Sequence, residues 1–135
     1  MAHLHSSVAS LRVKGDTLNP DEITRLLGAP PSYSHACGDE LIGHKTRQVR
    51  IAKSGMWSLH AGECEPEDLD SQVQEILGDL TADLSVWADL AQRFEIDLFC
   101  GLFMKVANEG VLLAPATLMA LGERGIALDL DIYAP

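Results

Sequence analysis

Two carboxylates near the end of the sequence fall on one side of an alternating segment and could form a binding or catalytic site. Asp129 and Asp131 alternate with apolar residues, and Asp97 takes an outward position in an earlier alternating segment. Paired carboxylates can bind a cation or act as general acid and base. If a basic strand lies beside an acidic one, however, the same residues form cross-strand charge pairs on a solvated sheet face, which is the interpretation we favour. The candidate ligand-binding residues of this polar sheet face are Arg12, Arg50, His60, Asp97, Asp129 and Asp131.

Five histidine and cysteine side chains are possible metal ligands. Imidazole and thiolate groups suit Zn²⁺, but the sequence has no C-x2-C pair and no closely spaced histidine pair. We therefore expect neither a metal nor another cofactor. The side chains concerned are His35, Cys37, His44, His60 and Cys64.

Familiar catalytic and phosphate-binding motifs are missing from the sequence. Residues 38–46 resemble a phosphate-binding loop, but His44 displaces the lysine and threonine by one position, and two acids would stand where phosphate charge must lie. Cys100 could act as a nucleophile only with a base beside it. Its alternation with apolar neighbours favours a place in the core instead. We expect no catalytic residue.

The net charge argues against nucleic acid and anionic membranes as partners. The chain has 135 residues, of which 10 are Lys or Arg and 20 are Asp or Glu, so its formal net charge is −10. Eleven of the acids, against Arg93 alone, fall between residues 62 and 97. The simplest interpretation is a solvated helix face that keeps the protein soluble, and the alternative is a surface that docks a basic protein. The acids of this candidate docking surface are Glu67, Asp68, Glu75, Asp79 and Asp83.

No segment has the features of a targeting signal or a membrane span. The N-terminal residues lack an apolar run long enough for a signal peptide, and no stretch approaches the ~18 apolar residues of a transmembrane helix. Cys37, Cys64 and Cys100 are an odd number, which is typical of reduced thiols in such a chain. We therefore expect a cytoplasmic protein.

The length of the chain indicates one domain, and its first elements are a strand and a helix. We expect residues 1–135 to form a single domain in which residues 1–7 are a flexible N-terminal tail. Val8 to Lys14 alternates with period two, which predicts a half-buried strand. An Asn-Pro pair then begins a helix that ends at Gly28.

The middle of the sequence predicts a hairpin and one long helix. Residues 47–53 and 56–61 alternate and predict the paired strands of a hairpin, or one strand broken by a bulge, after a loop that could hold one short strand. Val49 and Ile51 would face the core in this arrangement. Residues 66–94 carry apolar side chains at helical spacing, which predicts a helix of about 28 residues that could bend near its middle.

The final third of the sequence predicts two strands separated by a helix. Residues 95–104 alternate, a helix follows from Pro115 to Gly125, and residues 126–133 form the last strand. The order β-α-β-β-α-β-β-α-β indicates an α+β fold, with a mainly antiparallel sheet and helices packed on one face. The predicted core residues include Trp57, Trp87, Leu98, Cys100 and Leu130.

Several short segments resemble the pattern of a known family. They are Gly15-Asp16, Asn19 to Thr24, Gly38-Asp39, Trp57 to Leu59, Cys100-Gly101 and Leu112 to Tyr133. Together they resemble the bacterial domain-of-unknown-function 4279 family over nearly all of the chain. The resemblance implies a fold and says almost nothing about activity.

These observations favour binding over catalysis. We expect a non-catalytic binding module for a protein partner, with an immunity-like or regulatory role. A basic protein is the expected partner, rather than nucleic acid or a membrane. The alternative is an enzyme or small-molecule-binding protein that uses the polar sheet face, and a pocket holding the charged side chains of that face together would favour it.

Overall fold

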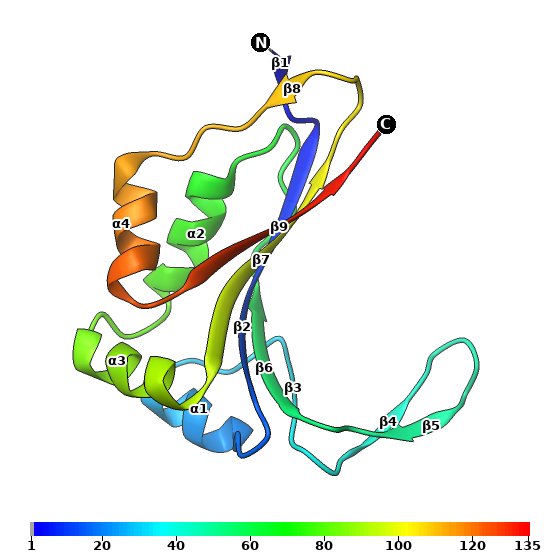
Figure 1. Cartoon of the computed structure of the whole chain (residues 1–135), viewed down its shortest axis with the longest axis vertical. Helices are drawn as coiled ribbons and strands as arrows, with labels where there is room; N and C mark the ends of the chain where they lie inside the picture. Colours follow the sequence, from blue (N-terminus) through cyan, green and yellow to red (C-terminus); the bar gives the residue numbers. More distant parts are fainter. Residues whose placement is uncertain (1) are drawn as a thin grey trace.

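A computed structural model describes residues 2–135, which fold into two layers, with helices covering one face of a five-stranded sheet (Figure 1). The sheet has the order β3-β6-β2-β7-β9. Its strands are β2 (Ser6–Gly15), β3 (Tyr33–His35), β6 (Gly55–His60), β7 (Glu95–Phe103) and β9 (Ala127–Tyr133). The helices are α1 (Pro20–Leu27), α2 (Leu69–Gly78), α3 (Leu84–Arg93) and α4 (Pro115–Glu123). Within this sheet only the β7–β9 pair is parallel, so the predicted α+β fold with a mainly antiparallel sheet is confirmed.

β2 is the central strand, and its alternation creates much of the core. Ala9, Leu11 and Val13 are buried, while Arg12 and Lys14 lie on the opposite face. β2 pairs antiparallel with β6 on one side and β7 on the other. The half-buried strand predicted for this segment is therefore confirmed.

Four of the five predicted core residues are buried, namely Trp57, Trp87, Leu98 and Cys100. Leu130 is 39% exposed, so its assignment to the core is wrong. It pairs in register with Cys100 on the core side of the sheet, but β9 is an edge strand that runs past the helices toward the C-terminus (Figure 1). Alternation assigns a residue to a face of the sheet, whereas burial also needs a layer that covers it.

The long helix predicted for residues 66–94 is two helices, α2 and α3. Asp68 and Asp83 are their N-caps, since each side chain accepts a backbone hydrogen bond from the first turn, at 3.2 and 3.0 Å. α2 consequently begins at Leu69 rather than at Pro66. Between the helices, the Thr81 N–H donates to a carbonyl oxygen at the end of α1 (2.8 Å), which fixes the break against α1. No helix within residues 2–135 has the length and apolar composition to cross a membrane.

The first and last helices lie where the sequence predicts them. Asn19 caps α1 by accepting a hydrogen bond from the Asp21 N–H (3.0 Å). Gly28 ends α1 with φ 92°, a left-handed conformation that glycine adopts at low cost. Pro115 begins α4, and Gly125, with φ 71°, turns the chain into β9.

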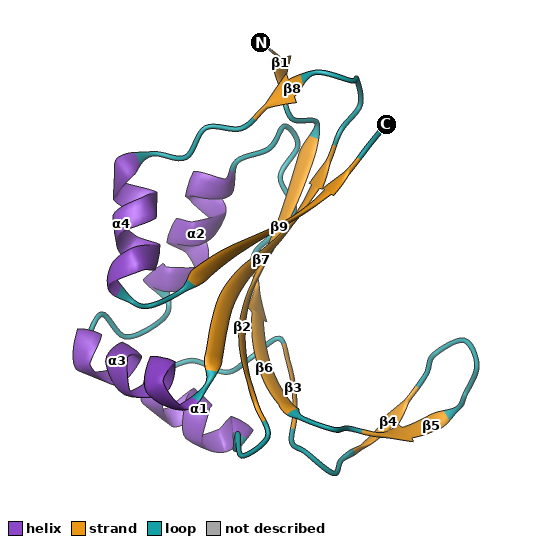
Figure 2. Cartoon of the chain, viewed as in Figure 1, coloured by secondary structure: helices purple, strands orange, loops and turns teal. Residues whose placement is uncertain are grey.

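Residues 36–54 leave the sheet between β3 and β6 and form a projecting hairpin, which we call the arm (Figure 2). Its strands are β4 (Glu40–Ile42) and β5 (Val49–Ile51). The predicted pairing of residues 47–53 with residues 56–61 is wrong, because β5 pairs with β4, whereas β6 pairs with β2 and β3. Val49 and Ile51 are 55% and 57% exposed rather than buried. Their alternation is real, but no helix within residues 2–135 lies over the arm (Figure 2).

The segment expected to be a flexible tail, residues 1–7, takes part in strands from residue 2 onward. β1 (Ala2–His3) pairs in parallel with β8 (Glu109–Gly110), and Leu4 is buried in the core. β2 then begins at Ser6, earlier than predicted. The pairing partner of β1 lies far away in the sequence, so no local pattern could reveal it.

Candidate functional site

One face of the five-stranded sheet is covered by no helix of residues 2–135, and we call it the open face (Figure 2). Strand register assigns to it the residues that alternate with the buried ones. These residues include Arg12 and Lys14 of β2, Ser58 and His60 of β6, Asp97, Phe99, Gly101 and Phe103 of β7, and Asp129, Asp131 and Tyr133 of β9. Charged, aromatic and small side chains thus share one surface.

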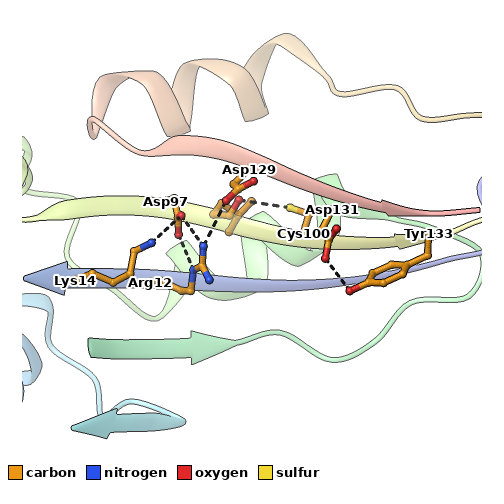
Figure 3. A network of polar contacts seen from close by, with 8 residues as sticks. Arg12, Lys14, Asp97, Cys100, Asp129, Asp131 and Tyr133 are labelled. Atoms are coloured by element: carbon orange, nitrogen blue, oxygen red, sulfur yellow. Dashed lines mark hydrogen bonds and ion pairs between the residues drawn. The ribbon is translucent and has the colours of Figure 1, made fainter. Parts of the chain in front are cut away.

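Arg12 and Asp97 form the centre of a charged network on the open face (Figure 3). They lie opposite each other on β2 and β7, and Arg12 donates from Nε to Oδ1 (2.9 Å) and from Nη2 to Oδ2 (2.7 Å) of Asp97. The same Nη2 lies 3.4 Å from Oδ2 of Asp129, and Nζ of Lys14 lies 3.5 Å from Oδ2 of Asp97. The cross-strand charge pairs expected on the sheet face are therefore confirmed.

The ion pair at the centre of this network favours the charged forms of Arg12 and Asp97. The hydrogen bond to Asp97 raises the pKa of Arg12, against the opposing effect of burial. Burial alone would raise the pKa of Asp97, but the hydrogen bonds and charge of Arg12 outweigh it, so this pKa lies below its ordinary value. A carboxyl group that ionises so readily is poorly suited to act as a general acid near neutral pH. Arg12 also lies over the ring of Phe99, with Cζ 4.3 Å from the ring centroid.

A stacked aromatic pair occupies the other end of the open face. The rings of Phe103 and Tyr133 are nearly parallel, with centroids 4.8 Å apart. The Tyr133 hydroxyl donates to Asp131 (2.7 Å), and this hydrogen bond raises the pKa of Tyr133 (Figure 3). Val8 and Phe103 fill the space over Gly101, where an added Cβ would come within 2.8 Å of Val8 Cγ2. This end of the face is therefore a packed surface.

Only part of the predicted sheet-face group comes together. The residues in direct contact are Arg12, Asp97 and Asp129. Asp131 lies farther along β9 and binds Tyr133, while His60 is exposed near the end of β6, opposite Ser10. Arg50 is on β5 in the arm and does not belong to the sheet. Its placement on the sheet face is wrong, because among residues 2–135 β5 pairs with β4 alone.

Cys100 is poorly suited to nucleophilic chemistry. The residue is buried in the core, as its alternation predicts. Burial raises the pKa of its thiol to about 12, with smaller contributions from nearby aspartates. Such a thiol stays protonated at neutral pH and is a packing group.

The histidines and cysteines considered as metal ligands are spread over the molecule. His44 lies in the arm, His60 near the end of β6, and Cys64 beside the start of β2. Within residues 2–135, no three His, Cys, Asp or Glu side chains gather in a way that could hold a metal ion.

Four acids of the candidate docking surface lie beside the ends of α2 and α3, and Glu75 lies within α2. Four of the five also bind backbone N–H groups. Asp68 and Asp83 cap the two helices. Glu67 accepts from an N–H at the start of α2 (2.7 Å), and Glu75 accepts from the loop before α2 (2.9 Å). Asp79 is exposed at the end of α2. Local hydrogen bonding therefore explains part of the acid content of this segment.

A cleft between α2 and α4 is a feature that sequence reasoning missed. It has a volume of about 310 Å³ and is lined in part by Val73, Leu77 and Arg124. The Arg124 side chain is 12% exposed, and its Nη1 donates to the Ala120 carbonyl oxygen and to Glu123, both at 3.0 Å. Its Nε is buried and has no hydrogen-bond partner within residues 2–135. A single arginine after a helix gives no sequence signal for such a site.

Comparison with known proteins identifies the family of this chain but finds no individual relative. Searches of curated proteins and of solved structures found no match. The family described as "Domain of unknown function (DUF4279)" matches residues 3–135, which is essentially the whole chain and confirms the resemblance seen in the short segments. The chain belongs to the DUF4279 family.

Proposed function

We propose that this protein is a non-catalytic binding module of the bacterial cytoplasm that docks a basic protein, in an immunity-like or regulatory role. The main support is uncompensated negative charge on the helical side of the molecule. Residues 63–89, which include α2 and the first part of α3, contain nine acids and no lysine or arginine. Such a field attracts basic surfaces and speeds their encounter, while it repels nucleic acid.

The acids on the open face are paired with cations to a greater extent than the acids on the helical side, which supports the helical side as the docking surface. On the open face, Arg12 and Lys14 neutralise acids of β7 and β9. On the helical side, Arg93 at the end of α3 already pairs with Glu22 at 3.1 Å and Asp89 at 3.4 Å, and Arg124, in the cleft between α2 and α4, pairs with Glu123 at 3.0 Å. The remaining acids have no such compensation from their own segment.

Binding fits the chemistry of the site better than catalysis. Asp97 is held in its ionised form by Arg12, and the thiol of Cys100 is buried with a pKa of about 12. Neither group is prepared to donate a proton or to attack a substrate. The three cysteines within residues 2–135 are free thiols, which supports a reducing compartment.

Kinetic binding measurements would test this proposal. The protein would be used to capture its partner from the native host, and the association rate of the purified partner would be measured across a salt series. We expect the rate to fall steeply with salt, and to fall about tenfold or more in the variant Glu63→Lys/Asp79→Lys, because electrostatic steering sets this rate. Both side chains are exposed, and neither residue is an N-cap.

The matched control is Asp16→Lys/Glu40→Lys, which makes the same change in net charge at exposed positions outside the acidic segment of residues 63–89. It should leave the association rate nearly unchanged. A partner whose association rate ignores both salt and the Glu63/Asp79 reversals would overturn the proposal, and the acids would then serve solubility alone.

A second candidate function, binding of a small carboxylate, has support in the cleft between α2 and α4 rather than on the polar sheet face. Arg124 lines this cleft together with apolar side chains of α2 and α4, so a carboxylate bound there would meet a cation beside an apolar wall. The cleft volume is at the lower end of the range for small-molecule sites. Hexanoate should raise the melting temperature of the wild type more than hexanol does, and Arg124→Met should abolish that difference. Equal shifts with both compounds would exclude this function.

A further inference from the structure

We propose that β5 of the arm pairs with the edge strand β9 of a second copy of this chain, so that two copies exchange arms. Each of these strands has one free edge within residues 2–135, because β5 pairs with β4 alone and β9 pairs with β7 alone. A free edge presents a row of backbone donors and acceptors that can bind another strand.

Apart from its two aspartates, β9 lacks the devices that usually protect an edge strand. Between Ala127 and Tyr133 it has no lysine, arginine or proline, and its ladder with β7 is continuous. On the helix side of the sheet, Leu130 and Ile132 are 39% and 57% exposed. On the open face, aspartates alternate with them. The free edge of β9 is therefore apolar on one side and acidic on the other.

The arm has the complementary pattern. Val49 and Ile51 are more than half exposed and lie on one face of the hairpin, while Arg50 lies on the other. The arm, residues 36–54, holds four of the ten lysines and arginines of the chain against two acids, Asp39 and Glu40. A two-stranded hairpin is at most marginally stable by itself, so the arm gains stability from a neighbouring strand.

Antiparallel pairing with Arg50 opposite Asp131 matches both patterns at once. With Arg50 opposite Asp131, Val49 lies opposite Ile132 and Ile51 opposite Leu130. The ion pair then falls on the open face, and the apolar pairs fall on the helix side. Asp131 accepts from Tyr133 through Oδ2, so Arg50 would bind its other oxygen. A shift by one residue would place Arg50 opposite an apolar side chain, which fixes the parity of the register. A shift by two residues would bring Arg50 opposite Asp129 instead, but Asp129 already pairs with Arg12.

The two strands do not pair within one chain. The arm is inserted between β3 and β6 at one edge of the sheet, and β9 is the opposite edge (Figure 1). β3 and β9 are separated by three strands, roughly 19 Å at ~4.8 Å per strand spacing. The partner strand therefore comes from a second copy, and reciprocal exchange gives a closed dimer, while one-way exchange gives a ring or a chain.

Charge reversal combined with measurement of the molecular mass in solution tests the pairing. We expect the wild type to form dimers or larger species of the 14.6 kDa chain. Arg50→Asp and Asp131→Arg should each reduce the mass to that of a single chain, because both place like charges opposite each other. The double variant Arg50→Asp/Asp131→Arg restores opposite charges and should associate again.

The controls change the net charge equally at exposed positions outside the two strands. Arg25→Asp on α1 matches Arg50→Asp, and Asp16→Arg before α1 matches Asp131→Arg. Both should associate as the wild type does, and circular dichroism would verify that every variant is folded. A wild type that stays a single chain at about 0.5 mM, or a folded double variant that stays dissociated, would overturn the proposal.

Cross-linking provides a second readout of the register. In a Cys37→Ser/Cys64→Ser background, Ile51→Cys and Leu130→Cys placed on separate chains should form an interchain disulfide under mild oxidation. Ile51→Cys mixed with Leu112→Cys, which lies before α4, is the matched control and should not. Equal cross-linking of both mixtures would contradict the pairing of β5 with β9.

Discussion

Arg12 and Asp97 form a two-point ion pair across β2 and β7, with donor–acceptor distances of 2.9 and 2.7 Å. Their side chains are 23% and 13% exposed, so solvent screens the pair only in part. Removing either partner leaves the other charge partly buried and unpaired. The pair therefore favours the observed register of the two strands.

We expect Asp97→Asn to lower the free energy of unfolding by about 1–3 kcal/mol at neutral pH, measured by urea denaturation. Arg12→Met should have a similar effect. The double variant should lose less than the sum of the two, because the second change leaves no further unpaired charge. Arg25→Met, at an exposed position on α1, is the control and should change stability by less than about 0.5 kcal/mol. Strictly additive losses would contradict the coupling.

The stability contributed by Asp97 should be lost in acid. The pKa of Asp97 in the folded protein lies below its ordinary value of about 3.9. Above that value the carboxylate is ionised in both the folded and unfolded states, so its contribution is constant. It declines as the pH falls below about 3.9 and is gone below the folded-state pKa. The difference in unfolding free energy between wild type and Asp97→Asn should follow this course, and a difference that persists unchanged at pH 2 would refute the assignment.

Trp87 should be among the most costly side chains to truncate. It lies on α3 and is fully buried in the core, and its Nε1 donates to the Thr81 carbonyl oxygen (2.8 Å). Trp87→Ala should lower the unfolding free energy by about 3–5 kcal/mol in urea denaturation. Leu112→Ala, at a position that is 78% exposed, serves as the comparison and should cost less than about 1 kcal/mol. Similar losses for the two variants would show that Trp87 does not support the core.

Local sequence patterns correctly predicted the structural features that depend on neighbouring residues alone. The period-two alternation of β2 assigns Leu11 and Val13 to the core because a strand's side chains alternate wherever it lies. Leu130 and Val49 show the same alternation and are exposed, since burial requires a covering layer that the rest of the chain supplies. The signal for the break between α2 and α3 was present in the capping aspartate Asp83, but helical apolar spacing continues across it.

In the candidate site, too, the sequence predicted the features that depend on local alternation and missed those that depend on long-range packing. The alternation of side chains along each strand is enough to place Arg12 and Asp97 on one face of the sheet. Their contact was predictable on the condition that their strands are neighbours. The same alternation could not show that β5, which carries Arg50, pairs outside the five-stranded sheet. The buried position of Arg124 depends on how α2 and α4 pack, which no spacing in the sequence encodes.

The three thiols should react at very different rates. Cys37 is exposed, Cys64 is partly buried with a pKa raised by burial and nearby acids, and Cys100 is buried with a pKa of about 12. With iodoacetamide at pH 8, mass spectrometry of the labelled peptides should show Cys37 modified first. Cys100 should be labelled only under denaturing conditions. Comparable rates at Cys37 and Cys100 in the folded protein would mean that Cys100 is accessible.

Two glycine-to-alanine variants should change stability in opposite directions. Gly101 lies in β7 on the open face, and a Cβ there would come within 2.8 Å of Val8 Cγ2 and 3.4 Å of the Phe103 ring. Because Val8 is β-branched and has little rotamer freedom, Gly101→Ala should lower the unfolding free energy by about 1–3 kcal/mol. Gly122 lies near the end of α4, and a Cβ there would meet no atom of residues 2–135 within 4 Å. Gly122→Ala should therefore raise stability by up to about 1 kcal/mol, since alanine loses less backbone entropy in a helix.

Urea denaturation of both variants, together with Gly101→Ala in a Val8→Ala background, separates the clash from any intrinsic effect of alanine in a strand. Truncating Val8 removes the atom that the new Cβ would strike. In that background, Gly101→Ala should cost much less than it does in the wild type, because the two changes act on one contact. If the cost is the same in both backgrounds, the side chains of Val8 and Phe103 are not packed over Gly101, and the aromatic end of the open face is looser than its stacked geometry implies.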